Sequence, residues 1–290
     1  MVSSAQSPLS NQARTTRWAT ATWEWVRDRG LLYLRCDLLQ AWEHGFFTKQ
    51  HWPQTPLELV HNLVPAAPVY RVKQVHGKAV LPTDQLTPRP HDREATPESG
   101  TALPPLRKAD GLVTTQAHES IWVCSADCSP VLMADVDTGQ VAAIHAGWRG
   151  TAVRIVPEAI AQLQARGSQL KNLRVAIGPA IAGTVYQVAA EVALQVAQSI
   201  HPNEVAKSQP PALLLAQLQA LDQPALYVDP EPDKLRLDVR RINALQLEAL
   251  GLHPEQIAIA PHCTYQDPEH FFSYRRTHEK QVQWSGIVSH

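Results

Sequence analysis

The sequence lacks the features that would place the protein on a membrane or on a nucleic acid. Among its 290 residues, 26 Lys and Arg balance 27 Asp and Glu, and no long basic run appears, so charge-driven binding to nucleic acid is not expected. No run of about 18 apolar residues occurs, which argues against a transmembrane helix. Residues 1–17 are polar and lack the apolar centre of a secretory signal. These absences predict a soluble, cytoplasmic protein, and no obligate protein partner is evident.

The sequence is also poor in cysteine and lacks several well-known motifs. Its four cysteines are Cys36, Cys124, Cys128 and Cys263, too few for a disulfide scaffold in a chain of this length. Cys36 ends an apolar, strand-like run and is expected to be a buried free thiol. The patterns H-E-x-x-H, G-x-x-x-x-G-K-[ST], G-x-G-x-x-G and the deaminase pattern H-x-E with P-C-x-x-C are absent. No H-x-H pair occurs, although multicopper oxidases need several.

The composition and the loop segments favour one domain. Hydrophobic residues make up 44% of the chain, enough for a large core. Residues 82–108 are rich in proline, which suits neither helix interiors nor central strands, and residues 201–211 also read as a loop. Candidate site residues, described below, lie on both sides of residues 82–108, so this segment is predicted to be an insertion within one domain. We predict a disordered tail over 1–17 and a single catalytic domain over 18–290, with a Pro-rich insertion near 84–107.

Short apolar or β-branched runs alternate with longer amphipathic segments. The runs predict strands at 31–36, 69–75, 111–114, 120–125, 131–136, 141–145, 173–177, 257–260 and 271–274. The amphipathic segments predict helices at 152–165, 189–200, 212–220 and 239–250. Residues 137–140 resemble a hairpin turn. The mixture of hairpins and helices predicts an α/β or mixed α+β layered fold with mixed strand directions.

Two histidines and one cysteine stand where predicted strands end. His76 precedes a glycine, Cys128 follows an apolar strand, and His145 precedes a run of small residues. Two imidazoles and one thiolate provide three protein ligands. This is the number found in catalytic zinc sites, where the fourth position stays open for water or substrate. We therefore predict that His76, Cys128 and His145 are both metal ligands and catalytic residues. Zn²⁺ is the expected ion, and Cu²⁺ is the alternative because such donors bind it more tightly.

The segment that follows His145 has the character of an anion site. Small residues let a ligand approach the backbone, and Thr151 is predicted to cap a helix whose first N–H groups suit an anion. Arg149 adds a fixed positive charge suited to phosphate. We predict substrate or phosphate contacts at Arg149, Gly150 and Thr151, and a further contact at Arg276. An ordinary strand-to-helix turn and a solvated arginine pair are the alternative interpretations.

These motifs, in this order, resemble the family long labelled multicopper polyphenol oxidase or laccase-domain proteins. Its bacterial members were also described as peptidoglycan-editing factors, and the family is now regarded as purine nucleoside phosphorylases with additional adenosine deaminase activity. The resemblance is carried by residues 44–46, 74–77, 109–114, 124–130, 144–151, 177–181 and 272–276. It implies a layered α-β-β-α sandwich, a metal triad at the two histidines and the cysteine, and purine nucleosides and phosphate as substrates. The long Pro-rich insertion, with Ser125 and Ser129, departs from the family pattern.

Three classes of function remain open. The leading hypothesis is a zinc-dependent purine nucleoside phosphorylase, which converts adenosine or inosine and phosphate to free base and ribose 1-phosphate, with adenosine deaminase activity. The second is a cysteine hydrolase that acts on a peptidoglycan precursor, with Cys128 as nucleophile and His145 as base. A copper-dependent polyphenol oxidase is less favoured, because the sequence supplies one three-ligand site and a copper relay needs several. The third class is a non-catalytic metal-binding or partner-binding module, which predicts metal binding without turnover.

Overall fold

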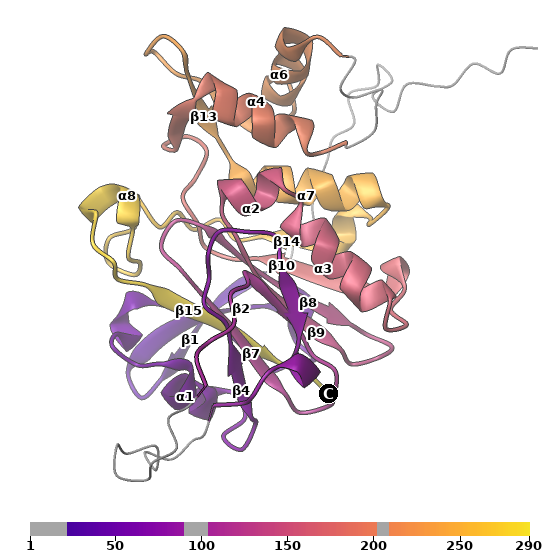
Figure 1. Cartoon of the computed structure of the whole chain (residues 1–290). Helices are drawn as coiled ribbons and strands as arrows, with labels where there is room; N and C mark the ends of the chain where they lie inside the picture. The colour runs from indigo at the N-terminus through magenta and orange to yellow at the C-terminus, as the bar shows by residue number, and fades with distance from the viewer. Residues whose placement is uncertain (1–21, 90–103, 202–208) are drawn as a thin grey trace, which may run out of the picture.

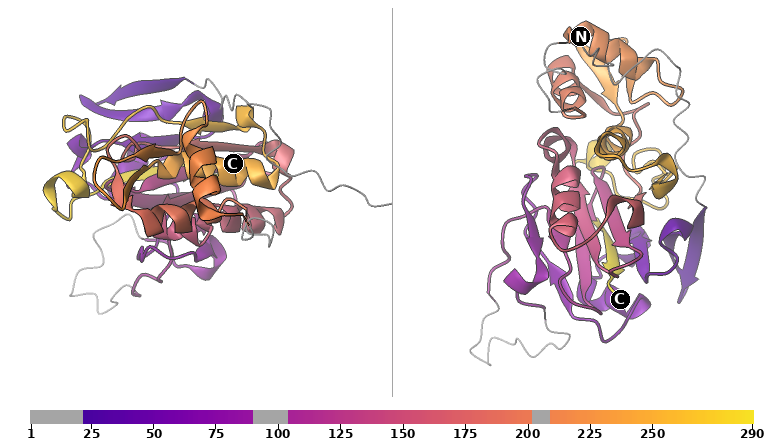
Figure 2. Two further views of the ribbon diagram at one scale, coloured as in Figure 1. Left: turned by 90° about the horizontal axis from the view of Figure 1, so that it is seen from above. Right: turned by 90° about the vertical axis from the view of Figure 1, so that its right-hand side faces the viewer.

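Two β-sheets packed face to face form the body of the protein, and a smaller lobe stands at one end of them (Figures 1 and 2). The computed structural model describes residues 22–89, 104–201 and 209–290. The predicted tail over 1–17 lies outside the described residues, as do most of the Pro-rich insertion and most of the loop predicted near 201–211. In the described part of the chain, no helix has the length and apolar character needed to cross a membrane.

The first sheet has six strands of mixed direction. Their order across the sheet is β1 (Trp23–Asp28), β2 (Leu31–Cys36), β3 (His44–Phe47), β15 (Gln283–Val288), β7 (Ser120–Ser125) and β4 (Val69–Arg71). Neighbouring strands are antiparallel except β4 and β7, which are parallel. Strand β15, the last in the sequence, therefore lies inside the sheet between β3 and β7, whereas β1, the first strand, lies at its edge.

The second sheet also has six strands. Their order is β14 (Ile257–Ile259), β10 (Leu173–Ile177), β8 (Ser129–Asp135), β9 (Val141–Ala146), β6 (Gly111–Val113) and β5 (Val80–Pro82). The pairs β10 with β14 and β5 with β6 are parallel, and the others are antiparallel. The predicted turn at 137–140 joins β8 and β9 into a hairpin, with Gly139 at a positive φ of 72°. The prediction of mixed strand directions is therefore confirmed.

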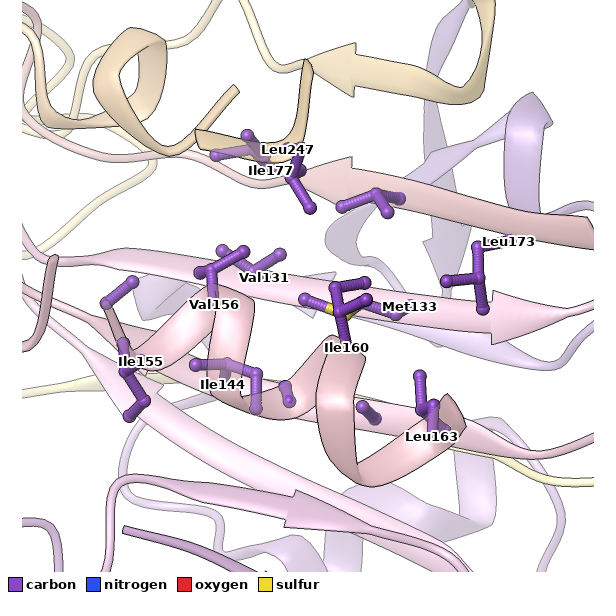
Figure 3. Packing of buried hydrophobic residues seen from close by; sticks show 14 of the residues in the cluster. Val131, Met133, Ile144, Ile155, Val156, Ile160, Leu163, Leu173, Ile177 and Leu247 are labelled. Carbon is purple, nitrogen blue, oxygen red and sulfur yellow. The ribbon is translucent and has the colours of Figure 1, made fainter. Parts of the chain in front are cut away.

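Side chains of the second sheet alternate between two cores, as a strand buried on both faces requires. Val131 and Met133 of β8 face helices α3 (Ile155–Gln164) and α7 (Val239–Leu250), whereas Leu132 and Ala134 face the first sheet. Figure 3 shows the α3 side chains packed on β8 and β9. Burial of one such aliphatic side chain is worth about 1.5–3 kcal/mol.

A fourth layer covers the outer face of the first sheet. There the short helix α1 (Pro56–Leu59) and the turn after it pack on Phe47 and Trp122, both almost fully buried. The order helix, sheet, sheet, helix confirms the predicted α-β-β-α sandwich of the mixed α+β class, although the outer helical layer is thin. The number of domains stays a prediction.

The lobe contains the third sheet and two helices. Its strands are β11 (Gln187–Ala189), β13 (Lys234–Leu237) and β12 (Leu226–Val228), and its helices are α4 (Ala190–Gln198) and α6 (Pro211–Gln219). They enclose a core of their own, against which Trp148 and Tyr186 also pack. The right-hand view of Figure 2 shows the lobe standing above the sandwich. Trp148 and Tyr186 therefore connect the lobe to the end of the sandwich where β9 finishes.

Three predicted elements differ from the structure. The helix predicted at 152–165 is two helices, α2 (Trp148–Ala152) and α3, because Arg154 takes a left-handed φ of 64° and donates to the carbonyls of Ser199 and Ile200. The strand predicted at 271–274 is absent, and helix α8 (Tyr274–Thr277) begins there instead, capped by the side chain of Ser273. The strand predicted at 69–75 ends at Arg71.

Candidate metal centre

The structure brings His76, Cys128 and His145 together at one end of the sandwich. His76 follows β4 of the first sheet, His145 lies in β9 of the second, and Cys128 lies in the connection between β7 and β8. One donor atom from each residue lies within 4.8 Å of the other two. The two imidazole rings are 4.8 Å apart between centroids, at an interplanar angle of 80°. Three segments far apart in the sequence thus converge on one point.

Unusual backbone geometry aims two of these side chains. His76 has φ of 60°, and Asp127, the residue before Cys128, has φ of 89°, a region that residues with a side chain seldom occupy. The Asp127 carboxylate holds its turn by accepting hydrogen bonds from the Thr264 hydroxyl at 2.7 Å and the Arg275 backbone N–H at 2.7 Å. A left-handed backbone conformation is costly for a residue with a side chain and persists only where the surrounding structure stabilises it. Such residues are concentrated at functional sites.

Gly147 is required by the close approach of the thiol. A Cβ atom at position 147 would lie 2.6 Å from the Cys128 Sγ and 3.5 Å from the His76 Cδ2. The first distance is shorter than any van der Waals contact, so any other residue here would displace the thiol.

Asp110 connects both histidines and is fully buried. Its carboxylate accepts the backbone N–H groups of Val75, His76 and Gly77, at 2.7 to 3.1 Å. It also accepts a hydrogen bond from the His145 Nδ1 at 2.9 Å. A carboxylate on one ring nitrogen fixes the tautomer and directs the other nitrogen at a metal. The Nε2 of His145 is therefore the nitrogen available as a ligand.

The electrostatics of the cluster favour a thiolate. Burial alone would raise the pKa of the Cys128 thiol, but the charge and hydrogen bonds of His145, together with His76, hold it well below its usual range. Burial would lower the pKa of His145, yet Cys128 and Asp110 raise it. Burial likewise opposes ionisation of Asp110, but the hydrogen bonds from His145, Gly77 and His76 lower its pKa. A thiolate is the form of cysteine that binds metal ions.

The donor set fits a zinc ion. Zinc bonds of about 2.0–2.3 Å in a tetrahedral site place neighbouring ligand atoms roughly 3.3–3.8 Å apart, and the present donors lie within 4.8 Å of one another. Three protein donors leave one position of a tetrahedron open. No fourth His, Cys, Asp or Glu joins the cluster in the described ranges, which is typical of catalytic rather than structural zinc sites.

One hollow adjoins the cluster, and a second pocket shares two of its lining residues. A hollow of about 30 Å³ touches Cys128, Gly147 and Asp127, room for roughly one or two water molecules. A larger pocket of about 350 Å³ lies beside it, and Trp148 and Tyr186 line both. Burial, together with the negative charges of Cys128 and Asp127, raises the pKa of Tyr186 to about 12. The Tyr186 hydroxyl therefore keeps its proton and can donate a hydrogen bond.

Of the residues predicted to bind phosphate, Arg149 is the one that is exposed to solvent. Its guanidinium carbon lies 4.5 Å from the centre of the Trp148 ring. Gly150 is buried inside α2. Thr151 is fully buried and does not cap the helix, because its hydroxyl donates to Asn243 and its N–H to the Gly147 carbonyl. The cap prediction for Thr151 is wrong.

Arg276 is used within the protein. Its Nη1 donates to the carbonyls of Thr264 and Tyr265, and its Nη2 donates to the carbonyl of Phe271. Its neighbour Arg275, which the sequence did not single out, is the arginine that lines the larger pocket. These contacts support the loop before α8 and occupy both terminal nitrogens of Arg276, and its phosphate contact stays a prediction.

Sequence reasoning also missed Asp110, Trp148, Tyr186 and Lys234. For Asp110 a signal was present, since it lies in the segment 109–114 that carried part of the family resemblance. A carboxylate is a common hydrogen-bond partner of a metal-ligating histidine. No local pattern marked Lys234, because the pocket that it lines forms only when β13 meets α2 and α8.

Comparisons with known proteins agree with this geometry. A family model described as multi-copper polyphenol oxidoreductase laccase matches residues 57–288. The chain is 50% identical to purine nucleoside phosphorylase slr1573 of Synechocystis over 268 residues, 92% of this chain and 97% of that protein. It is 32% identical to purine nucleoside phosphorylase Rv2149c of Mycobacterium tuberculosis over 213 residues, 73% of this chain and 69% of that protein.

The fold is shared with a solved structure. The crystal structure of YlmD from Geobacillus stearothermophilus matches with a TM-score of 0.68 at 25% identity, and the match covers 91% of this chain and 98% of that chain. The family model spans most of the chain, from the helix α1 to the last strand β15. The chain therefore belongs to the multi-copper polyphenol oxidoreductase laccase family.

Proposed function

We propose that the protein is a zinc-dependent purine nucleoside phosphorylase that also deaminates adenosine. It would convert adenosine or inosine and phosphate to free base and ribose 1-phosphate. The observation that carries the proposal is the convergence of His76, Cys128 and His145 beside a pocket large enough for a small ligand. The names of the relatives at 50% and 32% identity support the same substrate class.

The three residues of the cluster would hold the ion, and the neighbouring Asp110 orients the two histidines. His76, Cys128 and His145 would hold the zinc, and Asp110 orients His145 and the turn that carries His76. A bound zinc ion supplies Lewis acidity and lowers the pKa of a water molecule toward neutrality. The hollow beside Cys128 has room for a water molecule next to the three residues that would hold the ion.

The walls of the pocket suit a nucleoside. Trp148 and Tyr186 offer aromatic faces to a purine, and aromatic stacking on a base is worth about 1–3 kcal/mol. The Tyr186 hydroxyl stays protonated and would be a hydrogen-bond donor to a substrate in the pocket. Arg149, next to Trp148 in the chain and against its ring, adds positive charge for an anionic group.

The family description names copper, but the site supports single-ion chemistry. In the three described ranges, one cluster of three donors is present, whereas an electron relay through copper needs several centres. The same donors bind Cu²⁺ more tightly than Zn²⁺ in general. Because one cluster cannot form a copper relay, we propose zinc as the working ion. Since Cu²⁺ binds such donors more tightly, it could replace zinc, and we propose that phosphorolysis is lost in the copper-bound state.

A cysteine hydrolase is the second candidate, because the lowered pKa of Cys128 beside His145 is also what a nucleophile requires. The two candidates respond oppositely to chelation. A zinc enzyme loses activity in a strong chelator and regains it with zinc, whereas a cysteine hydrolase acting on a peptidoglycan-type substrate keeps its activity and is blocked by a thiol alkylating reagent.

The test is incubation of zinc-loaded protein with adenosine, with and without phosphate, followed by chromatography of the bases. Adenine that appears only with phosphate supports phosphorolysis, and inosine that appears without phosphate supports deamination. His76→Asn should abolish both products. His118→Asn is a matched control, since His118 is also exposed and has φ of 62° against 60° for His76. Folded, zinc-loaded protein that forms neither product refutes the proposal.

A further inference from the structure

The larger pocket lies where the lobe meets the sandwich. Helix α2 contributes Trp148 to its wall, β13 contributes Lys234, and α8 contributes Arg275. Its volume of about 350 Å³ falls within the range of roughly 300–1,000 Å³ that is usual for small-molecule sites. It shares Trp148 and Tyr186 with the hollow at Cys128, so these two side chains lie between the pocket and the metal cluster.

The charged side chains that line this pocket are both cations. Lys234 and Arg275 contribute to the wall, and no acidic side chain of the described residues does so. The Lys234 Nζ has no hydrogen-bond or ion-pair partner in the described part of the chain. Two cations without a lining anion favour a negatively charged ligand group.

Arg275 is fixed relative to the metal cluster. Its backbone N–H donates to the Asp127 carboxylate at 2.7 Å, and Asp127 immediately precedes Cys128. Its side-chain Nη1 donates to the Gln187 carbonyl at 2.9 Å, and its guanidinium carbon lies 4.8 Å from the centre of the Tyr186 ring. These contacts use one face and one nitrogen of the guanidinium, which leaves other N–H groups for an anion.

We propose that Lys234 and Arg275 form a subsite for a phosphate group, separated from the metal cluster by the aromatic pair Trp148 and Tyr186. A flexible ammonium and a planar guanidinium are a suitable combination for phosphate oxygens. The assignment of this group as the second substrate of phosphorolysis rests on the proposed function, whereas its binding does not. Free inorganic phosphate and the phosphate of a nucleotide share the required chemistry, so the test separates them.

The test measures binding of inorganic phosphate and of adenosine 5′-monophosphate to the zinc-loaded protein by calorimetry, without turnover. Lys234→Met should weaken phosphate binding about tenfold or more, the loss expected for a hydrogen-bonded charge. Arg275→Lys is a second variant that keeps the positive charge and the backbone contact with Asp127. Lys171→Met is the matched control, because Lys171 is exposed in the turn before the first residue of β10 and does not line the pocket.

Each outcome decides a separate point. Phosphate binding that Lys234→Met weakens and Lys171→Met leaves unchanged supports the subsite. Binding of the nucleotide alone, with the same dependence on Lys234, also supports the subsite and identifies the source as a nucleotide. Unchanged binding in Lys234→Met and Arg275→Lys, or no binding of either ligand to the parent protein, overturns the subsite. Tight phosphate binding without any base release would refute the proposed phosphorolysis and leave the subsite standing.

Discussion

Replacement of Asp110 by asparagine tests the proposed organisation of the metal centre most directly. Asparagine has the same shape but only one acceptor oxygen, and its amide nitrogen presents two hydrogens. Oδ1 of Asp110 accepts from His76 and His145, whereas Oδ2 accepts from Gly77. In either orientation of the amide, at least one N–H group loses its acceptor and meets another N–H.

The expected loss follows from these contacts. A hydrogen bond to a charged group is worth about 1.5–3 kcal/mol, and removal of a carboxylate that supports a ligand histidine typically lowers metal affinity 10–100-fold. We therefore expect Asp110→Asn to weaken zinc binding by roughly 10–100-fold, equivalent to about 1.4–2.8 kcal/mol. The catalytic rate per bound zinc should also fall, because the tautomer of His145 is no longer fixed.

Zinc affinity can be measured by competition with a coloured chelator, with circular dichroism to confirm folding. Asp135→Asn is the matched control: Asp135 is also fully buried and accepts the backbone N–H groups of Asp137 and Thr138, but at the far end of β8. It should change folding stability and leave zinc affinity unaltered. Folded Asp110→Asn that binds zinc within threefold of the parent protein would show that Asp110 does not position the ligands.

Three further changes probe the site, a buried titratable group and the core. Gly147→Ala should cut zinc stoichiometry well below that of the parent protein, since its Cβ would lie 2.6 Å from the Cys128 Sγ; Gly167→Ala, with open space around it, should retain full zinc content by elemental analysis. Burial lowers the pKa of His44 to about 4, below its usual 6.5, so the neutral form stabilises the fold above pH 6.5 and this contribution is lost as the pH falls toward 4. The resulting loss in the free energy of unfolding is at most about 3 kcal/mol. Urea unfolding of His44→Gln should therefore depend less on pH between 6.5 and 4 than unfolding of the parent protein; an equal dependence on pH would contradict this. Ile160→Ala in α3, at 1% exposure, should reduce the free energy of unfolding by about 2–5 kcal/mol, and a loss below 1 kcal/mol would mean that the core in Figure 3 is not closely packed.

Most strands of the second sheet and the helix α7 were predictable, because their sequences carry local signals. Mostly apolar runs at 131–136, 141–145 and 173–177 are typical of strands buried on both faces. Strand β15 was not predicted; Gly286 lies in its middle, and glycine weakens a strand interior. The structure gives the reason for that glycine: a Cβ there would lie 2.4 Å from the Trp122 ring, a contact between strands 164 positions apart in the chain.

The ligand cluster was predictable because each ligand ends or follows a strand beside glycine, small residues or proline. Its supports were not, since Asp110 acts on the turn at 75–77 and on His145 across 33 to 35 positions of the chain, and no local pattern contains that relation. The choice between Arg275 and Arg276 was equally out of reach. It depends on the direction of each side chain from the single turn of α8, whereas the sequence predicted a strand at 271–274 that ends just before the two arginines.

The three proposed ligands belong to different parts of the sandwich: one follows a strand of the first sheet, one lies in the second, and one lies on the connection between them. An ion held by all three would act as a cross-link between the two halves of the body. Since a ligand that binds only the folded state adds RT ln(1 + [L]/Kd) to its stability, metal occupancy and resistance to heat would rise together. Metal loss would then open the molecule first along the seam between the sheets, at the end where the pocket lies.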